Sequence, residues 1–303
     1  MKIICTTVVR AAEHGSTHGG LYVIDMEEGE VLHYAPYDES FVNDNERGGE
    51  RGLRGVCVLD DRIIVASATS LIELDKETYE IVRKLENRDI FRSIHEICFF
   101  ANSIWVTSTA LDCVAQVDLD FNLVGFYQIL GESKLDHKSL TGKTIIDPSK
   151  AKEEDNYHIN SISSTSGRLT FGGLITDLYD FDSMQPVCSM PAIQGARSFQ
   201  HNFYEYEDLS LVNLTGFNKL AIINSGATSF VDIPRSKNVE YHADEIAEDN
   251  WNRGLARLGS RVLIGSSPAR VLEFDMDTNK FVKEISIESD MRHCIHGLEV
   301  LEV

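Results

Sequence analysis

Long apolar runs and clusters of basic residues are both missing from this chain of 303 residues. No stretch approaches the roughly 18 or more apolar residues that a membrane-spanning helix needs. Lys and Arg number 28 against 48 Asp and Glu, which gives a net charge of −20, and the basic residues are scattered. Such a chain repels nucleic acids and anionic lipid surfaces. We therefore expect no nucleic-acid partner and no membrane partner.

Cysteine is present six times but never as a C-x-x-C pair. Cys57 and Cys98 occupy the same apolar place in two related segments, which is typical of small core residues. Without a disulfide framework and without a secretory signal near Lys2, the pattern favours reduced thiols in a cytoplasmic protein. We expect all six thiols to be free: Cys5, Cys57, Cys98, Cys113, Cys188 and Cys294.

Short catalytic motifs are also missing. The sequence contains no G-x-S-x-G elbow and no H-E-x-x-H pair. The glycine-rich stretch at residues 49–55 opens a strand pattern, so it has no helix dipole with which to bind a phosphate. Any active site must therefore be assembled from residues far apart in the chain.

The chain does contain a motif that recurs six times. Each copy has an anchor dipeptide and, further on, a short strand ending in Asp or Asn; in five copies the two are 20–22 positions apart. The anchors are Gly55-Val56, Glu96-Ile97, Ser161-Ile162, Asn202-Phe203, Gly254-Leu255 and Gly297-Leu298. The strands are Leu71–Asp75, Val114–Asp118, Leu178–Asp182, Leu220–Asn224, Val271–Asp275 and Leu21–Asp25. A repeat of roughly 40–50 residues with several strands indicates a β-propeller.

The sixth copy must combine the two ends of the chain. Residues 296–303 have the pattern of a first strand, and residues 2–9 match the second strand of the other copies, such as residues 63–67. Pairing these segments closes the ring and removes open edge strands. We therefore predict an all-β, six-bladed β-propeller with four-stranded antiparallel blades, and a single domain over residues 1–303.

Insertions interrupt the repeat at Ala35–Arg51, Gly131–Tyr157 and Pro234–Asn250, each directly before an anchor. A fourth, Arg10–Gly20, separates two strands of the terminal blade and contains His18. These positions predict loops gathered on one face, where binding residues concentrate.

The residue before each anchor is polar and flanked by apolar strand residues. In order, the six are Arg54, His95, Asn160, His201, Arg253 and His296. Equivalent places in a six-fold ring predict that these side chains line the central channel. His95, His201 and His296 then form a site for one divalent transition metal such as Zn, Fe or Mn. Arg54, Asn160 and Arg253 become ligands for a small anionic molecule. His158 and His18 are candidate general acid–base groups. The alternative is a hydrated channel without a ligand.

Three strings have the form of propeller blade openings: residues 158–162 (HINSI), residues 201–203 (HNF) and residues 253–256 (RGLA), the last backed by the strand Val262–Ser267. They resemble six-bladed propellers of the NHL, TolB-like and regucalcin/gluconolactonase superfamily, and are closest to uncharacterised bacterial members. The resemblance implies the fold over the whole chain. The acidic metal ligands of regucalcin-type lactonases have no counterpart at the six positions, which counts against lactonase activity.

Two functions remain open at this point. One is a metal-assisted lyase, hydrolase or isomerase acting on a small anionic substrate. The other is a non-catalytic propeller that binds a partner protein or small ligand through its loop-rich face.

Overall fold

The computed structural model describes residues 1–13, 15–38, 52–134, 137–164, 167–175, 177–189, 200–207, 209–241 and 250–302. Within these ranges no helix is long and apolar enough to cross a membrane. The helical segments described are three 3-10 turns: η1 (Thr109–Leu111), η2 (Pro148–Lys150) and η3 (Thr215–Phe217). Parts of two predicted insertions, residues 39–51 and 242–249, lie outside the described residues.

The described strands form six antiparallel sheets, the blades of a six-bladed β-propeller. The chain divides into two compact units. Unit 1 comprises Met1–Ala68, Ile72–Arg83 and Asp232–Val303, and unit 2 comprises Thr69–Leu71 and Lys84–Val231. The prediction of a single domain over residues 1–303 stays a prediction.

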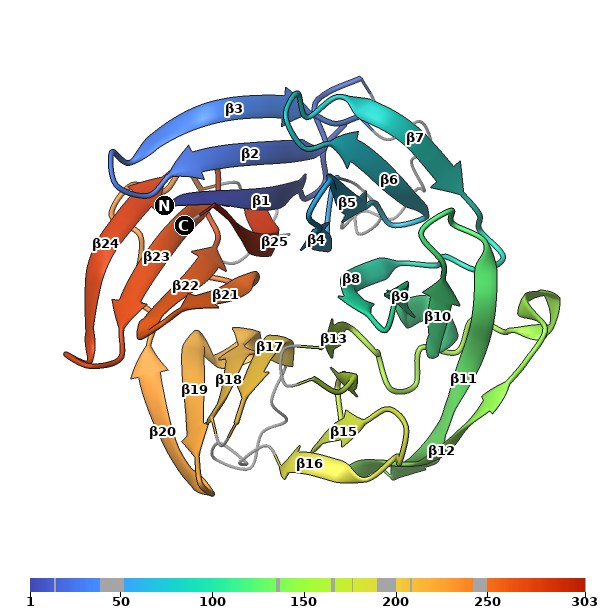
Figure 1. Ribbon diagram of the computed structural model, residues 1–303. Helices are drawn as coiled ribbons and strands as arrows, with labels where there is room; N and C mark the ends of the chain where they lie inside the picture. The colour runs from blue at the N-terminus through green and yellow to red at the C-terminus, as the bar shows by residue number, and fades with distance from the viewer. Residues whose placement is uncertain are drawn as a thin grey trace. The chain divides into compact units, whose positions relative to one another are not determined.

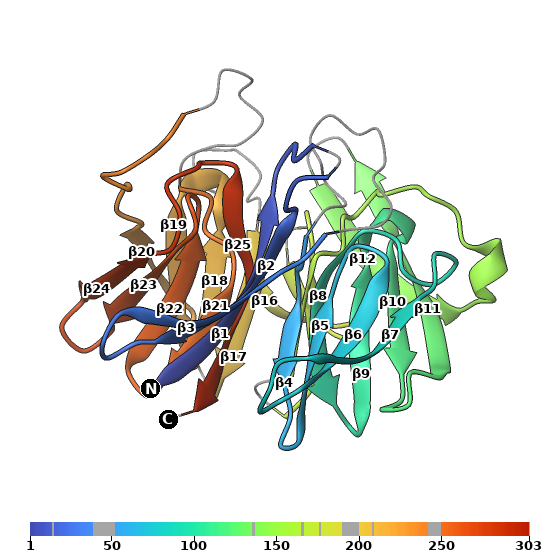
Figure 2. The same cartoon turned by 90° about the horizontal axis from the view of Figure 1, so that it is seen from above.

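One blade of unit 1 contains both ends of the chain, as predicted. Its strand order is β25-β1-β2-β3, and Figures 1 and 2 both show the N- and C-termini side by side at this blade. β1 pairs with β25 from Lys2 opposite Glu302 to Val9 opposite His293. The strands of this blade are β25 (His293–Glu302), β1 (Lys2–Val9), β2 (Gly19–Asp25) and β3 (Glu30–Pro36).

The other blades follow in chain order. Next to the terminal blade in sequence are β4 (Val56–Val58), β5 (Arg62–Ala66), β6 (Ser70–Asp75) and β7 (Ile81–Glu86). The last blade of unit 1 has β21 (Leu255–Leu258), β22 (Arg261–Ser266), β23 (Arg270–Asp275) and β24 (Lys280–Ser286). Unit 2 contains β8 (Ile94–Phe100), β9 (Ser103–Ser108), β10 (Cys113–Val117), β11 (Leu123–Lys134) and β12 (His137–Ile145) in one sheet. Its remaining sheets are β13 (Ser161–Ser163), β14 (Thr170–Gly172), β15 (Asp177–Asp180) and β16 (Pro186–Ser189), and β17 (Gln200–Tyr206), β18 (Leu209–Leu214), β19 (Lys219–Asn224) and β20 (Ala227–Asp232).

One sheet of unit 2 has five strands where four were predicted. Its order is β12-β11-β10-β9-β8, and β12 extends the hairpin that β11 begins. The sequence predicts a loop at this position because the segment is polar and rich in Lys and Asp. Leu140 is nevertheless buried and packs in the cluster that contains Trp105 and Ile129. That apolar contact is a physical reason for the extra strand to form.

The repeated Asp has a structural role at the end of the third strand. In most blades its carboxylate accepts a backbone N–H from the turn that follows: Asp25 from Glu27, Asp75 from Glu77 and Asp275 from Asp277. Hydrogen bonds from the backbone N–H and the hydroxyl of Thr78, and then from the N–H of Glu77, lower the pKa of Asp75. In the β13–β16 blade the prediction of Asp182 was wrong, because the strand ends at Asp180, which accepts from Ser183. An aspartate that binds the backbone of its own turn fixes each hairpin.

The six thiols are free, as predicted. Four of them, Cys5, Cys57, Cys113 and Cys294, are buried. Burial raises the pKa of Cys113 to about 12, which keeps that thiol protonated and unreactive.

Candidate metal centre in unit 2

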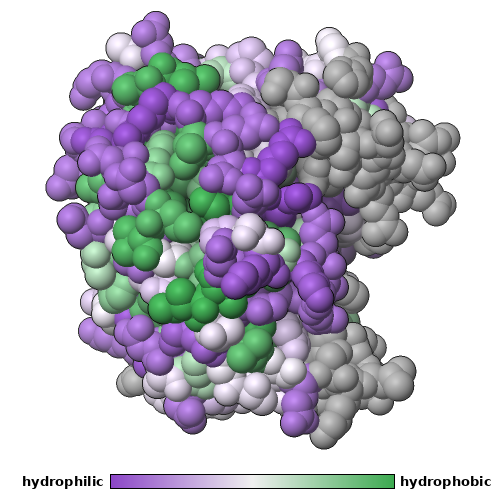
Figure 3. Space-filling model, turned by 90° about the vertical axis from the view of Figure 1, so that its right-hand side faces the viewer, coloured by the Kyte–Doolittle hydropathy of each residue, from purple (hydrophilic) through white to green (hydrophobic). Residues whose placement is uncertain are grey.

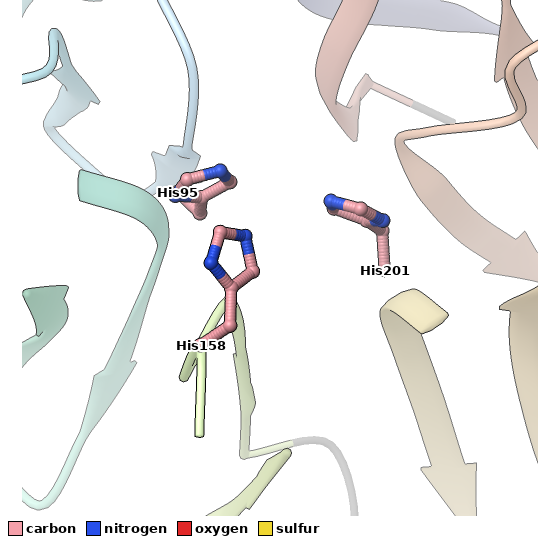
Figure 4. A group of neighbouring side chains, drawn as sticks. All are labelled: His95, His158 and His201. Carbon is pink, nitrogen blue, oxygen red and sulfur yellow. The ribbon is translucent and has the colours of Figure 1, made fainter. Parts of the chain in front are cut away.

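Three histidines of unit 2 gather at one point. His95 and His201 are the second residues of β8 and β17, and His158 lies just before β13. One nitrogen of each ring lies within 4.8 Å of the other two. Figure 4 shows His95 beside His158, with His201 facing them across a gap. The ring centroids are 5.1 Å apart for His95 and His158 and 6.0 Å apart for His95 and His201.

The separation of the three nitrogens is slightly wider than in a closed metal site. Tetrahedral coordination with Zn–N bonds of about 2.0–2.1 Å places ligand nitrogens about 3.3–3.4 Å apart. The three nitrogens here lie within 4.8 Å of one another. From that upper limit, ring rotations that bring the nitrogens closer by up to about 1.4 Å would produce that geometry. His95 and His201 are largely buried and His158 is half-buried.

The imidazole of His95 is fixed by hydrogen bonds at Nδ1. That atom lies 2.9 Å from the carbonyl oxygen of Ser93 and 2.9 Å from Oγ1 of Thr109. Thr109 donates its own hydroxyl hydrogen to the carbonyl of Ile159, at 2.6 Å, so it accepts from His95. Two acceptors at Nδ1 place the proton of the neutral ring on that nitrogen. Nε2 therefore carries the lone pair that a metal would use.

His158 is oriented by a carboxylate. Its Nδ1 lies 2.8 Å from Oδ1 of Asp155, three residues earlier. A carboxylate on one ring nitrogen leaves the other, Nε2, as the metal-binding nitrogen. His158 has φ 49°, in the left-handed region that few non-glycine residues adopt. His158 therefore lies in a turn before β13, and its direction is set by that turn and not by strand alternation.

A buried carboxylate supports that turn. Asp112 accepts backbone N–H groups from three consecutive residues: Asn156, Tyr157 at 3.0 Å and His158 at 3.0 Å. Burial raises the pKa of Asp112, and the three backbone donors oppose the rise. The turn that carries His158 is thus attached to the end of β9 and its 3-10 turn, the same region that supplies Thr109.

His95 and His201 are connected through their next neighbours. The carboxamide of Asn202 donates to the carboxylate of Glu96, and these two residues directly follow the histidines. Asn160 adds a second link, since its Nδ2 donates to the carbonyl of Gln200 at 2.9 Å, directly before His201. Oδ1 of Asn160 is buried and has no hydrogen-bond partner in the described structure. That oxygen is suited to accept a hydrogen bond from a bound water or hydroxyl.

The other predicted site residues lie in unit 1. Arg54, Arg253 and His296 are buried, like their three counterparts in unit 2. Nη1 of Arg253 donates to Nε2 of His296 at 2.9 Å, which occupies the nitrogen that a metal would use. His18 is buried, with Nε2 3.3 Å from the carbonyl oxygen of Glu13. A metal site formed by His95, His201 and His296 stays a prediction. In the group that the structure shows in unit 2, the third histidine is His158.

Sequence reasoning missed the residues that position the histidines: Thr109, Asp112, Asp155, Glu96 and Asn202. One signal was present in the repeat. Four anchors begin with Gly or Ser, whereas the two after His95 and His201 begin with Glu and Asn. These two anchor residues, Glu96 and Asn202, are hydrogen-bonded to each other in the structure.

The chain matches no protein-family model and no curated protein. Solved structures share its fold at very low sequence identity. A chain of a nidogen/laminin complex matches with a TM-score of 0.59 and 9% identity, covering 99% of this chain and 98% of that one. Virginiamycin B lyase from Staphylococcus aureus has a TM-score of 0.52 and 11% identity, over 94% and 85%. Apo AztD from Citrobacter koseri has 0.51 and 10%, over 98% and 97%. These similarities show the propeller fold.

Proposed function

We propose that the protein is a metal-binding propeller in which His95, His158 and His201 hold one divalent transition metal. The observation that carries this proposal is the hydrogen bonding behind the ligands. Nδ1 of His95 and Nδ1 of His158 are both bound to acceptors, which directs Nε2 of each ring to metal coordination. Three neutral imidazoles suit Zn, Fe, Cu or Ni better than Mg or Ca.

The reaction class that best fits such a centre is a metal-assisted lyase, hydrolase or isomerase step on a small anionic substrate. A metal with three protein ligands has open positions, where it acts as a Lewis acid or activates water. In unit 2 the free oxygen of Asn160 would orient a hydroxyl or water. In unit 1, Arg54 and Arg253 stay the proposed ligands of a small anion, and His18 stays a candidate acid–base group. The structures of lyases among the similar folds are consistent with this proposal but share the fold alone.

The setting that we propose is cytoplasmic, with neither nucleic acid nor membrane as partner. Six free thiols and a net charge of −20 support it. From the blade openings we also propose that the chain belongs to the NHL or gluconolactonase group of propellers.

The alternative, a propeller that binds a partner protein through its loops, has less support in the described residues. Their strongly exposed aromatic side chains are separated along the chain, on β3, β17, β20 and the segment after it: Tyr34, Tyr206, Phe230 and Tyr241. On the face shown in Figure 3, hydrophobic groups form islands among hydrophilic side chains. A docking surface for a protein usually has a larger continuous apolar patch.

The metal content of the purified, untagged protein tests the proposal. We expect about one transition metal per chain, and at least a tenfold loss of metal affinity in His201→Ala, because one of three protein ligands is removed. His33→Ala is the matched control, since His33 is a half-buried histidine on β3 of the other unit and contacts Tyr79. Equal metal content in wild-type protein and in both variants would contradict the proposal.

A further inference from the structure

Two long polar side chains depart from the repeat directly after two of the candidate metal ligands. Glu96 follows His95 on β8, and Asn202 follows His201 on β17. The other four anchors begin with Gly or Ser. At Gly297 a larger residue has no room, because a Cβ there would lie 2.3 Å from a backbone carbonyl oxygen. The repeat thus favours a small residue at this position, and both exceptions stand beside a candidate ligand.

Both exceptions lie in β-bulges. The pairing of β8 with β9 shifts register between Ile94 and Ile97, and that of β17 with β18 shifts between His201 and Phe203. A bulge re-aims the side chains of the extra residues, so a histidine and its successor are released from strict alternation between the two faces of the strand. Asn202 has φ 48°, a left-handed conformation that Asn adopts more readily than most residues.

The bulge on β8 is held to the neighbouring strand by Thr107. Oγ1 of Thr107 accepts the N–H of His95 at 3.3 Å and that of Glu96 at 3.0 Å, and it donates to the carbonyl of Glu96 at 3.2 Å. From this fixed backbone the carboxylate of Glu96 accepts a hydrogen bond from the carboxamide of Asn202. A charged acceptor makes such a bond stronger than one between neutral groups. We call this hydrogen bond the Glu96–Asn202 tether.

The tether joins the two sides of the candidate metal centre. On one side, the hydroxyl of Thr109 links the ring of His95 to the carbonyl of Ile159, the residue after His158. His201 faces these two histidines across a gap (Figure 4). Because the tether connects the residues that follow His95 and His201, it limits how far His201 can move away from the other two rings.

We propose that the Glu96–Asn202 tether sets the spacing of His95 and His201, and thereby selects a small transition-metal ion over a larger one. Zn–N bonds of about 2.0–2.1 Å require ligand nitrogens about 3.3–3.4 Å apart, so the two sides must be held close together. A larger ion accepts a wider spacing and depends less on the tether. Glu96 and Asn202 act through the histidines and are positioning residues. This inference deepens the proposed function, on which it rests, by naming the size of the metal ion.

Competition titrations of metal-free protein with Zn²⁺ and Cd²⁺ test the tether. The two ions share the same charge and a filled d shell, and Cd²⁺ is the larger. Asn202→Gly should lower Zn²⁺ affinity about tenfold and change Cd²⁺ affinity little, so that the ratio of the two affinities falls by a similar factor. Glycine keeps the left-handed backbone and removes the carboxamide. Glu96→Ala should have the same effect, whereas Glu96→Gln, which keeps an oxygen for Asn202, should retain most of the preference.

Gln116→Ala is the matched control. Gln116 on β10 donates to Oγ of Ser103 on β9 at 3.0 Å, in the same sheet as β8. Its loss should leave the ratio of the two metal affinities unchanged. A protein with both Glu96→Ala and Asn202→Gly should lose no more Zn²⁺ affinity than either single variant, because each change removes the same hydrogen bond.

The ratio separates positioning from a general structural defect, since such a defect weakens both ions alike. An unchanged ratio in the Asn202→Gly and Glu96→Ala proteins, or losses that add in the double variant, would overturn the inference while the metal centre itself stands. A wild-type protein that binds neither ion would contradict the proposed metal centre and the tether with it.

Discussion

Thr109 joins two parts of the candidate metal centre through one hydroxyl. It accepts from the ring of His95 and donates to the carbonyl of Ile159, next to His158. The hydroxyl therefore orients the ring of His95 and also holds the segment that carries His158 close to it. Such partners behind metal ligands commonly affect affinity as strongly as a weak ligand does.

Thr109→Val should lower metal affinity about 10–100-fold while the fold is retained. The valine keeps the shape of the side chain but cannot accept from Nδ1 of His95. Thr170→Val is the control, since Thr170 is buried in the same unit and its hydroxyl donates to Glu205. The measurement is a competition titration against a chromophoric chelator. Equal losses in the two variants would indicate a general structural effect and no specific role for Thr109.

His293 should make stability depend on pH. Burial lowers the pKa of this ring from its ordinary 6.5 to about 4, and Nε2 lies 2.8 Å from Oγ1 of Thr7. The unfolded chain therefore binds a proton at a higher pH than the folded one. The stability from the neutral ring is present above about pH 6.5 and is lost as pH falls towards about 4.

Between pH 7 and pH 5 this single group should cost about 2 kcal/mol of unfolding free energy. Urea unfolding of metal-free protein at the two pH values measures it, and His293→Gln should reduce the difference. If the variant shows the same pH dependence as the wild type, the effect arises from other groups.

At the scale of elements, the turn at residues 155–158 depends on Asp112. Removing that carboxylate leaves three backbone N–H groups without their acceptor. Asp112→Ala should therefore lower the free energy of unfolding by about 3 kcal/mol and weaken metal binding as the turn loosens. Asp112→Asn, which keeps one oxygen, should have a smaller effect on both.

Asp147→Ala is the control for this prediction. Asp147 is an exposed aspartate in the same unit that caps η2 by accepting from Ser149 at 3.0 Å. Its loss should cost about 1 kcal/mol, typical of a cap, and leave metal affinity unchanged. Chemical unfolding and metal titration of the variants provide both readings. A stable Asp112→Ala protein with normal metal affinity would contradict the assigned role.

The elements that the sequence predicts best are those tied to the repeat. Anchors and terminal aspartates recur because every blade needs the same inner strand and the same turn. β12 was missed because its polar, alternating pattern is also typical of a loop. The position of His158 depends on a hydrogen bond to Asp112, 46 positions earlier, and on the left-handed backbone conformation of His158 itself. The period of the repeat reveals neither feature. The repeat located His95 and His201, whereas the third member of their group comes from tertiary contacts.

For the whole molecule, the net charge of −20 acts differently on the two proposed ligands. A negative protein attracts metal cations and repels anions over distances near the Debye length, about 8–10 Å at ordinary salt. The net charge alone favours the binding of a metal cation, whereas the binding of an anion requires a local concentration of positive charge. Arg54 and Arg253 are the residues that we propose to supply such charge within an acidic chain.

Deleting residues 293–303 should expose β1 as an open edge strand. We expect the truncated protein to aggregate and to lose its cooperative unfolding transition, because β1 then lacks the neighbour with which it pairs from end to end. Size-exclusion chromatography and urea unfolding measure the two effects. Glu302→Ala is the control: it removes only the exposed ion pair with Lys2, 2.9 Å long, and should cost no more than about 1 kcal/mol. A truncated protein that elutes and unfolds like the wild type would contradict the prediction.

The pairing of β1 with β25 also has a consequence for how the protein is made. β1 leaves the ribosome long before β25, because Val9 and its partner His293 are 284 positions apart. At about 5–20 residues per second, the residues between them take roughly 15–60 s to synthesise. During that time β1 can pair with β2, but its other edge has no partner from its own chain. A chaperone that binds extended apolar segments would protect the stretch IICTTVV at residues 3–9. Of the six blades, the one that synthesis begins first is thus the one that it completes last.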